Sequence, residues 1–375
     1  MNLKRKILII ENSIATTGSF QVALRTSISL RNQYDFVFIL PKKSKAISAV
    51  EESNFKLYQL PLYELRKDIW SVLLYVPRLI RSVNQVKVIA KIEGISIVHV
   101  NDFYNLIMPL WRVAGCKLPY ICYVNFVPDR FPMIVRKLWI NSHMFFAAKI
   151  VAVSQHVLKQ LPVDEKVICI PDALPLEDTK ISIEMVEKKN TILFLGNYIS
   201  GKGQDLAIQA FASIAPKHPN WKLKMVGGDM GLEKNKVYKK GLQYLADKLG
   251  VKKQIEIADF TKDIAREYRE ADIALNFSIS ESFSLTVQEA MFYGCPIIAT
   301  RSGGPSELIE NEFSGLLIPV NDIEKMRASI EYLIENPSER ERLSVHAKQS
   351  IREKYDRKAT IDLLDQTYQN VLRRY

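Results

Sequence analysis

The sequence lacks the signatures of several large protein classes. Its four cysteines are scattered and form no CxxC pair, which excludes a disulfide-stapled scaffold and a cysteine-based zinc site and suits a reducing compartment. With 15 glycines and 16 prolines in 375 residues, the chain is neither collagen-like nor a long disordered protein. No run of 18 uncharged apolar residues occurs, so no transmembrane helix is expected.

The first ten residues also predict no signal peptide. A basic cluster of Lys4, Arg5 and Lys6 is followed by only four apolar residues, 7–10, before Glu11. This run is too short for the core of a signal peptide, and it predicts a first buried strand instead. We therefore expect a cytoplasmic protein.

The chain has a net charge of +11, and the whole excess of basic over acidic residues lies in its first 150 residues. Those residues contain 21 Lys or Arg and 9 acidic residues, whereas residues 151–375 contain 31 and 32. Such asymmetry indicates a polyanionic partner: anionic lipid, nucleic acid or an acidic substrate.

Two segments, 65–92 and 130–149, place basic residues beside aliphatic and aromatic ones. This pattern is typical of helices that lie in a bilayer interface, and equally of amphipathic helices that pack on a sheet. No nucleic-acid reading motif accompanies the charge, so we expect no nucleic-acid partner. An anionic membrane surface is the favoured partner, which predicts a protein peripheral to the inner membrane.

Short apolar runs alternate with longer helical patterns along the whole chain, as in parallel sheets that helices cover on both faces. Twelve runs exceed one comfortable open sheet, so the sequence predicts an α/β protein with two doubly wound domains. The runs are residues 7–10, 36–40, 97–100, 120–124, 150–153, 167–170, 192–195, 223–226, 255–257, 273–275, 297–299 and 316–318.

A charged, proline-containing stretch separates the two predicted domains. We expect an N-terminal domain over residues 1–172, a linker over 173–190 and a C-terminal domain over 191–355. Residues 356–375 form a predicted C-terminal helix that packs back on the N-terminal domain. Ligands of doubly wound folds bind at the carboxyl ends of the strands, which places a cleft between two such domains.

The first chemical motif is a glycine-rich loop between a strand and a helix. Gly196, Gly201 and Lys202 match the phosphate loop G-x-x-x-x-G-K, but Gly203 stands where Ser or Thr would hold magnesium. A dinucleotide fingerprint fails as well, because its third glycine position holds Leu206. A nucleotidase and a dinucleotide enzyme are therefore disfavoured. Free N–H groups at a helix N-terminus, together with Lys202, still suit an anion.

The second motif places two glutamates, Glu281 and Glu289, on either side of a predicted helix start. Ser284 is the expected N-cap of a helix over 285–293, which Gly294 ends. The N–H groups at the start of this helix would face an anion, with one carboxylate on each side. Because carboxylates accept hydrogen bonds from hydroxyls, the arrangement suits a glycosyl diphosphate flanked by sugar and ribose.

The spacing E-x7-E of Glu281 and Glu289, followed by GG-x-x-E and G-L-L-x-P, resembles the signature of the family 4 retaining glycosyltransferases. The resemblance is clear over about residues 150–335 and faint in residues 1–150. It implies the GT-B fold, in which two Rossmann-like domains face each other across a cleft. It also implies a nucleotide sugar as co-substrate and no further cofactor.

The resemblance implies a role for each matching residue. Glu281 would contact the donor sugar and stabilise charge at its anomeric carbon, and Glu289 would bind the ribose hydroxyls. Lys202 would neutralise the diphosphate, so that Glu281 and Lys202 are the predicted catalytic residues. The N–H groups of Leu285 and Thr286 would hold the distal phosphate.

Several donor-side positions depart from the family or extend its pattern. Asn197 stands where the family commonly has Arg, so one diphosphate cation is missing, and Ser284 stands where Gly is common. Gly18 occupies the place of the family's glycine-rich loop after the first strand. Asp259, which follows a predicted strand, is a candidate contact for the nucleotide base, and UDP and GDP remain equally open.

On the acceptor side, the family often has a histidine where this chain has Asn125. His99 is the only nearby imidazole. We expect it to be a hydrogen-bonded histidine at a strand end rather than a catalytic group, and we keep both residues as acceptor-side candidates.

Glycosyl transfer chiefly requires stabilisation of the leaving diphosphate, which preorganised N–H groups and a lysine can supply. The chain contains no Asp-x-Asp pair, so a metal-independent scheme is favoured. We expect a hexosyltransferase-type enzyme that adds a sugar to a lipid-linked glycan or surface polysaccharide precursor, as in lipopolysaccharide or capsule synthesis. A soluble acceptor and a non-catalytic GT-B-like binding protein remain alternatives. A glycoside hydrolase fits poorly, because both glutamates lie on one loop–helix unit.

Overall fold

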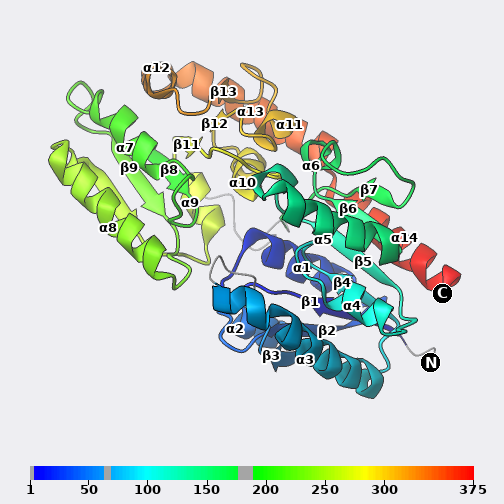
Figure 1. The fold of residues 1–375 in the computed structure, drawn as a ribbon. Coiled ribbons are helices and arrows are strands. Elements are labelled where there is room, and N and C mark those ends of the chain that lie inside the picture. Colours follow the sequence, from blue (N-terminus) through cyan, green and yellow to red (C-terminus); the bar gives the residue numbers. More distant parts are fainter. Residues whose placement is uncertain (1–3, 63–68, 176–188) are drawn as a thin grey trace. The chain divides into compact units, whose positions relative to one another are not determined.

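The computed structural model describes residues 4–62, 69–175 and 189–375 of the chain (Figure 1). The chain divides into two compact units, Met1–Ala173 with Lys358–Tyr375, and Leu174–Arg357. Each unit contains one parallel sheet with helices on both faces, so the predicted pair of doubly wound α/β domains is confirmed. Most of the predicted linker, 176–188, lies outside the described residues.

The sheet of the N-terminal unit has seven parallel strands in the order β3-β2-β1-β4-β5-β6-β7. Its strands are β1 Arg5–Ile10, β2 Tyr34–Pro41, β3 Lys56–Leu60, β4 Ile97–Val100, β5 Tyr120–Val124, β6 Lys149–Ala152 and β7 Val167–Cys169. Six of them contain the predicted apolar runs. The seventh, β3, was not predicted, because this edge strand is only partly buried and carries polar residues along its length.

The centre of this sheet is buried on both faces. Strand β1 lies between β2 and β4, with Ile7 opposite Phe36 on one side and Ile97 on the other. All three of these residues are buried. Continuous apolar strands of this kind are what parallel sheets with two covered faces require.

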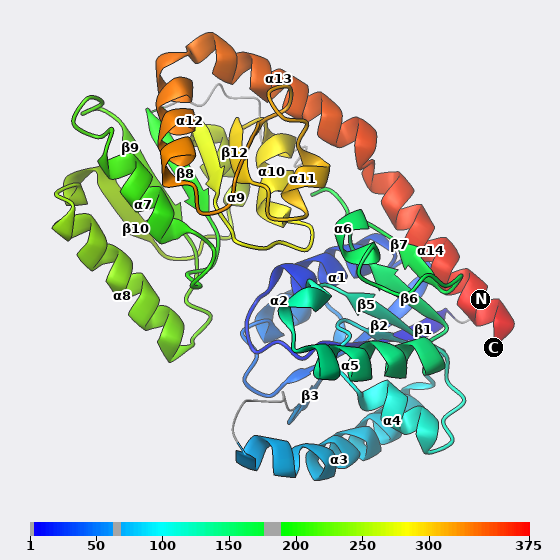
Figure 2. The ribbon, with the colours of Figure 1, turned by 45° about the horizontal axis from the view of Figure 1, so that its top comes forward.

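The helices of the N-terminal unit are α1 Gly18–Ser29, α2 Ile47–Glu52, α3 Ile69–Glu93, α4 Ile107–Val113, α5 Met133–Phe146 and α6 Gln155–Leu158, with a 3₁₀ turn at Pro128–Arg130. Helix α4 packs against both α3 and α5, so these three helices form one layer over the sheet (Figure 2).

The last helix, α14 Arg357–Arg374, belongs to the N-terminal unit from Lys358 onward. Two hydrogen bonds tie it to the sheet of that unit. The hydroxyl of Tyr368 lies 2.7 Å from Nδ1 of His99 on β4, and Tyr34 on β2 donates to Asp365 at 2.6 Å. The C-terminal end of the chain is therefore part of the N-terminal core.

The C-terminal unit has six parallel strands in the order β10-β9-β8-β11-β12-β13, and all six contain predicted runs. The strands are β8 Thr191–Leu195, β9 Lys222–Val226, β10 Ile255–Ala258, β11 Ile273–Asn276, β12 Ile297–Thr300 and β13 Leu316–Ile318. The helices are α7 Gln204–Ala212, α8 Glu233–Lys248, α9 Ile264–Glu270, α10 Leu285–Tyr293, α11 Pro305–Leu308, α12 Ile323–Glu335 and α13 Pro337–Lys354, with a 3₁₀ turn at Lys252–Gln254.

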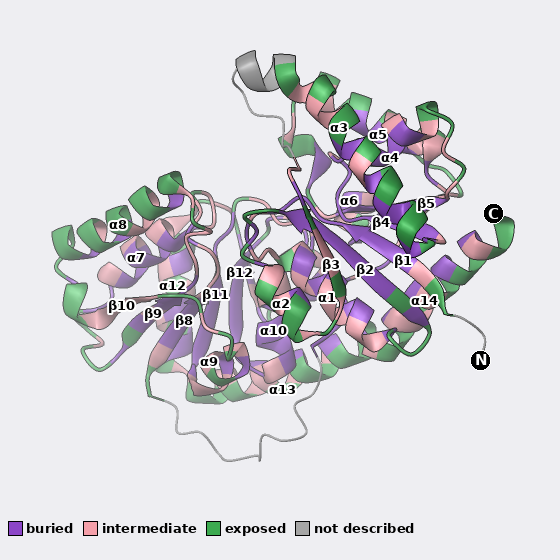
Figure 3. Cartoon of the chain, turned by 90° about the horizontal axis from the view of Figure 1, so that it is seen from below, coloured by how far each residue is buried: buried purple, intermediate pink, exposed green. Residues whose placement is uncertain are grey.

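Burial follows this layering in both units (Figure 3). Most strands are buried along most of their length, whereas the edge strands β3, β7 and β10 are only partly buried. Most helices are buried on one side and exposed on the other. Among the helices that the structure describes, none combines the length and the apolar character needed to cross a membrane.

Candidate functional site

The glycine-rich loop of the C-terminal unit leads from β8 to α7. Gly201 and Gly203 both adopt the left-handed backbone region, at φ 93° and 88°, which side chains disfavour. A Cβ atom at Gly203 would lie 2.3 Å from the carbonyl oxygen of Phe277, which follows β11. Close packing of the loop on β11 therefore explains why glycine replaces the Ser or Thr of a nucleotidase loop.

Lys202, between these glycines, forms an ion pair with Glu281. Its Nζ atom lies 2.7 Å from Oε1 of Glu281, and Ser278 donates a hydrogen bond of 2.6 Å to the same oxygen. Burial by itself would raise the pKa of Glu281, since its side chain is only 11% exposed, but Lys202 and Ser278 outweigh burial and lower it. Glu281 is therefore a carboxylate at neutral pH.

The backbone of Glu281 is held by the second glycine-rich turn. Its N–H donates to Ser302 at 2.8 Å, and Gly304 donates to its carbonyl oxygen at 3.0 Å. A Cβ atom at Gly304 would lie 2.1 Å from the carbonyl oxygen of Phe283, so no larger residue fits without a shift of backbone. The GG turn fixes the loop that carries Glu281.

Helix α10 begins at Leu285 and ends at Gly294, as the sequence predicts, and the C-cap glycine has φ 74°. Ser284 is the N-cap residue, but its side chain does not form the expected capping hydrogen bond. Ser284 has φ 86°, and its hydroxyl accepts a hydrogen bond of 3.1 Å from Asn276 on β11 instead. Asn276 also donates to Thr286 Oγ1 at 2.9 Å, so it holds the start of the helix from two sides.

The N-terminus of α10 retains the character of an anion site. The first intrahelical bond runs from Gln288 N–H to Ser284, and the amides before it point out of the helix start. These include Leu285 and Thr286, the predicted phosphate ligands. Partial positive charge at a helix N-terminus favours a phosphate there.

Glu289 lies in the second turn of α10 and is buried. It is close enough to Tyr268 on α9 that, after burial, its charge contributes to raising the pKa of that tyrosine. Tyr268 donates a hydrogen bond of 2.8 Å to the carbonyl oxygen of Thr286. The structure thus places both glutamates on one loop–helix unit, one before the helix and one inside it.

Comparison with known proteins identifies this unit. Residues 177–350 match the family described as glycosyl transferases group 1. The chain carries a glycosyltransferase domain. The resemblance to the nucleotide-sugar-dependent glycosyltransferases of family 4 is thereby confirmed.

Relatives and solved structures agree with this assignment. The chain is 27% identical to an uncharacterized glycosyltransferase of Haemophilus influenzae, over 89% of this chain and 92% of that protein. The crystal structure of Anabaena HepE with UDP-glucose is similar with a TM-score of 0.81 at 18% identity, over 97% and 99% of the two chains. The lipopolysaccharide outer core galactosyltransferase WaaB is similar with a TM-score of 0.69 at 16% identity, over 98% and 99%. The predicted GT-B fold is confirmed.

Asn197, which stands where the resemblance implies an arginine, has a structural partner in this domain. Its Oδ1 atom accepts a hydrogen bond of 3.3 Å from the N–H of Gly228, beside a backbone bond of 2.9 Å between Tyr198 and Gly228. The side chain therefore links the loops that follow β8 and β9. It adds no positive charge to the site.

Asp259 is placed with its side chain in solvent. Its carboxylate is 92% exposed and lies 2.5 Å from Nζ of Lys239, which itself sits 4.9 Å from the centre of the Tyr198 ring. The hydroxyl of Tyr198 donates to the carbonyl oxygen of Ala258 at 2.6 Å. The predicted contact of this segment with a base stays a prediction.

The remaining predicted residues lie in the N-terminal unit. Gly18 is the first residue of α1, next to Thr17, whose hydroxyl caps the helix. His99 is buried, bonded to Tyr368 and stacked on Tyr123 at 4.4 Å, and burial lowers its pKa to about 3. It is a neutral part of the core, as expected of a hydrogen-bonded histidine at a strand end.

Asn125, the other acceptor-side candidate, belongs to a polar network at the ends of β1, β4 and β5. It donates to the carbonyl oxygen of Asn101 at 2.6 Å, and Asn101 donates to Glu11. Glu11 also accepts a bond of 2.8 Å from the N–H of Ser13, and burial raises its pKa. Sequence reasoning missed Glu11, although a lone acidic residue directly after a buried strand was a usable signal.

The described part of the chain brings one set of metal-ligating side chains together, namely His218, Glu331 and Glu335. Lys217 and Arg327 already pair with Glu331, at 3.0 and 2.9 Å. Two cations beside the shared carboxylate oppose a metal ion there.

Proposed function

We propose that this glycosyltransferase moves a sugar from a nucleoside diphosphate sugar, with retention at the anomeric carbon and without a metal ion. The observation that carries the proposal is the Lys202–Glu281 pair, tied to the loop that starts α10. The C-terminal unit then combines a helix start that suits a phosphate with the cation of Lys202 and the carboxylate of Glu281. HepE from Anabaena, which has the same fold, is known with UDP-glucose bound.

The leaving diphosphate accumulates negative charge as the glycosidic bond breaks. The ammonium of Lys202 and the N–H groups of Leu285 and Thr286 stabilise that charge, a contribution that is often the largest in such reactions. In the family that the chain resembles, the acceptor attacks from the same face, assisted by the leaving phosphate. The protein therefore supplies electrostatic stabilisation rather than a strong base.

Glu281 and Glu289 divide the remaining tasks. Glu281 stays ionised because its pKa is lowered, so it can stabilise positive charge that develops at the anomeric carbon. Glu289, inside the helix, accepts hydrogen bonds from the ribose hydroxyls. Because Asn197 supplies no cation, Lys202 carries a larger share of the diphosphate charge than in relatives with arginine.

Thermal unfolding with UDP, GDP, ADP or CDP, each with and without EDTA, tests the donor site. A ligand at 100 times its dissociation constant stabilises the folded state by about 2.7 kcal/mol. A shift with one diphosphate that EDTA leaves unchanged supports the proposal and identifies the base. The Lys202→Ala variant must lose most of that shift.

For the acceptor we propose a lipid-linked glycan or surface polysaccharide precursor at the inner membrane. The support is the charge of residues 1–150, which carry 21 basic and 9 acidic residues. WaaB, similar in fold, is described as a lipopolysaccharide outer core galactosyltransferase. With the donor identified, transfer of labelled sugar to a polyprenyl-diphosphate-linked glycan should exceed transfer to the same glycan free in solution. Equal transfer to both favours the soluble acceptor.

A non-catalytic binding protein is the second candidate, and Asn197 is the observation that favours it, since its side chain is engaged with Gly228 and brings no charge. Restoring the cation with Asn197→Arg separates the two. If the wild type binds no diphosphate and the variant does, the non-catalytic candidate holds.

A further inference from the structure

Helix α5 has two apolar faces, and only one of them packs on the protein. On the inner face, Trp139 contacts the rings of Phe131 and Phe103 at 5.4 and 5.8 Å between centroids. His143, one turn further along, lies 2.9 Å from the carbonyl oxygen of Phe103. The helix is therefore firmly held from the inside.

The outer face of α5 presents a second apolar stripe to solvent. Ile134, Leu138 and Phe145 follow one another at helical spacing, and they are 80%, 59% and 78% exposed. Met133, at the start of the helix, is exposed as well. No described part of the chain covers these side chains. A contiguous exposed stripe of large apolar residues marks an interaction surface.

The layer that α5 forms with α3 and α4 (Figure 2) is also rich in basic residues. The three helices contain seven Lys or Arg and a single acidic residue, Glu93. Glu93 is buried and engaged, with Lys56 at 2.6 Å and Tyr58 at 2.5 Å, so it does not offset the surface charge. The cations are Arg78, Arg81, Lys87, Lys91, Arg112, Arg136 and Lys137.

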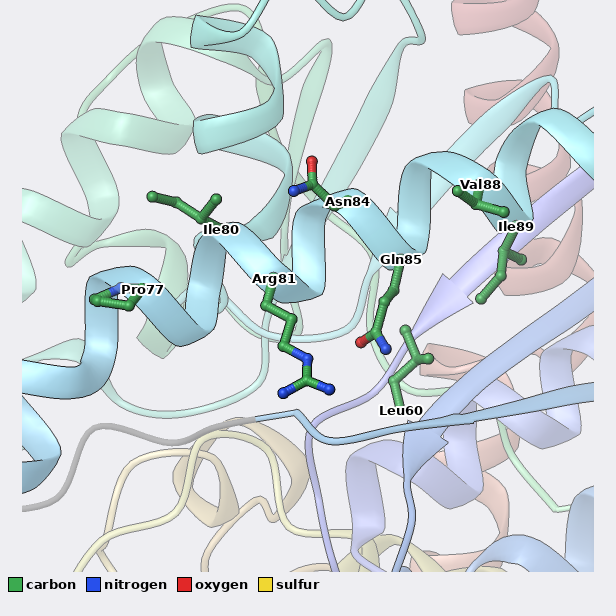
Figure 4. Close-up of a pocket in the computed structure, with 8 residues that line it drawn as sticks. All are labelled: Leu60, Pro77, Ile80, Arg81, Asn84, Gln85, Val88 and Ile89. Atoms are coloured by element: carbon green, nitrogen blue, oxygen red, sulfur yellow. The ribbon is translucent and has the colours of Figure 1, made fainter.

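Helix α3 adds an open groove to this layer, with a volume of about 610 Å³ (Figure 4). Its walls are mostly apolar, including Leu60 at the end of β3 and Pro77, Val88 and Ile89 on the helix. Arg81 is the charged group of the groove, and no acidic residue lines it. An aliphatic chain with an anionic head group matches this lining.

We propose that the outer face of the α3–α4–α5 layer docks on an anionic lipid bilayer, with Ile134, Leu138 and Phe145 in the interface and the cations at the head groups. Basic helices with an apolar stripe bind membranes in this way, by buried apolar area together with attraction to anionic lipid. The inference deepens the proposed function and rests on it for its purpose, since a lipid-linked acceptor lies in that surface.

A second copy of the chain fits this face poorly. In a symmetric dimer the same patch meets itself, which would bring its exposed cations, such as Arg81, Lys87 and Lys137, against one another. Nucleic acid suits it no better, because the stripe offers bases no hydrogen bonds and a single ring, Phe145, for stacking. An anionic bilayer satisfies both the charge and the apolar side chains.

Co-sedimentation of the full chain with phosphatidylcholine vesicles, with and without about a third of phosphatidylglycerol, tests the inference. We expect tighter binding to the anionic vesicles, weakened by salt. The double variant Ile134→Glu, Phe145→Glu should bind them at least about tenfold more weakly. Val345→Glu is the matched control, because Val345 is 58% exposed on α13 of the C-terminal unit, and its binding should equal that of the wild type.

Two results overturn the inference: equal binding to both kinds of vesicle, or undiminished binding of the double variant. Self-association in sedimentation velocity that the double variant abolishes, without vesicle binding, assigns the face to a second copy and overturns it too. The shift of the melting midpoint with the diphosphate must stay at the wild-type value in the double variant. If the wild type binds no diphosphate but binds the anionic vesicles, the proposed function is refuted and the docking inference is not.

Discussion

Replacing Lys202 by methionine tests the electrostatics of the donor site directly. Methionine keeps the length of the aliphatic chain and removes the charge that faces Glu281 at 2.7 Å. Breaking a fully buried ion pair costs about 3–5 kcal/mol, because the remaining charge stays desolvated. The Lys202 side chain is 34% exposed, so we expect a smaller loss, about 2 kcal/mol at pH 7.

The unfolding free energy that Lys202→Met loses must become smaller as the pH falls. In the wild type the pKa of Glu281 is lowered, so the pair stabilises the fold above the unfolded pKa, 4.5, and this contribution is lost as the pH falls. In Lys202→Met we expect burial to outweigh the remaining hydrogen bond of Ser278 and to raise the pKa of Glu281. Ionised Glu281 would then destabilise the variant at neutral pH, and protonation of Glu281 would remove that penalty. The difference between the two proteins should therefore shrink from pH 7 towards pH 4.

Thermal and chemical unfolding at both pH values measure this difference. A loss of 2 kcal/mol lowers the midpoint by about 2–3 °C if the whole chain melts together, and by about 5 °C if the C-terminal unit melts separately. Lys217→Met is the matched control, since Lys217 pairs with Glu331 at 3.0 Å but is 69% exposed, and we expect under about 1 kcal/mol. Equal losses in the two variants, or a loss at position 202 that persists at pH 4, would refute the reasoning.

Three further outcomes follow from the contacts of single residues. Glu289→Ala should lower turnover at least about 100-fold, measured as release of the diphosphate that the melting screen identifies, and a near wild-type rate would remove it from the site. Ser284→Gly should be about 1–2 kcal/mol more stable to denaturant than Ser284→Ala, because a Cβ atom is strained at φ 86°, and equal stabilities would contradict that strain. Tyr368→Phe should cost about 1–3 kcal/mol in urea unfolding, because it removes the buried partner of His99, whereas a loss below about 0.5 kcal/mol would show that the bond contributes little.

The sequence predicted most of the fold because buried parallel strands are continuous apolar runs. Residues 7–10 and 273–275 illustrate this, since each lies in a strand that is buried on both faces. Strand β3 escaped prediction because only Leu60, its last residue, is buried, while Lys56 and Gln59 face solvent. An edge strand is defined by the neighbour that it pairs with, and local sequence does not reveal that neighbour.

The sequence predicted which residues lie in the site better than it predicted which residues they contact. Spacing along the chain placed Ser284 correctly at the N-cap, because helix starts have a local signature. The partner of its hydroxyl, Asn276, lies on the preceding strand, and the pairing depends on how the loop folds back over β11. Asn197 shows the same limit, since its bond to Gly228 spans 31 residues.

In the proposed donor site, the absence of a positive charge at Asn197 changes how the site must respond to its donor. Without a diphosphate, the ammonium of Lys202 is held by Glu281 and its charge is compensated. In the proposed complex, a diphosphate at the start of α10 would compete with Glu281 for this same ammonium, and Asn197 would offer the phosphates no second charge to share. Donor binding would therefore draw Lys202 from the carboxylate and leave Glu281 with an uncompensated negative charge beside the sugar. That charge would favour a developing positive anomeric carbon, so the proposal implies that a site with one cation couples donor binding to Glu281 more strongly than a site with two.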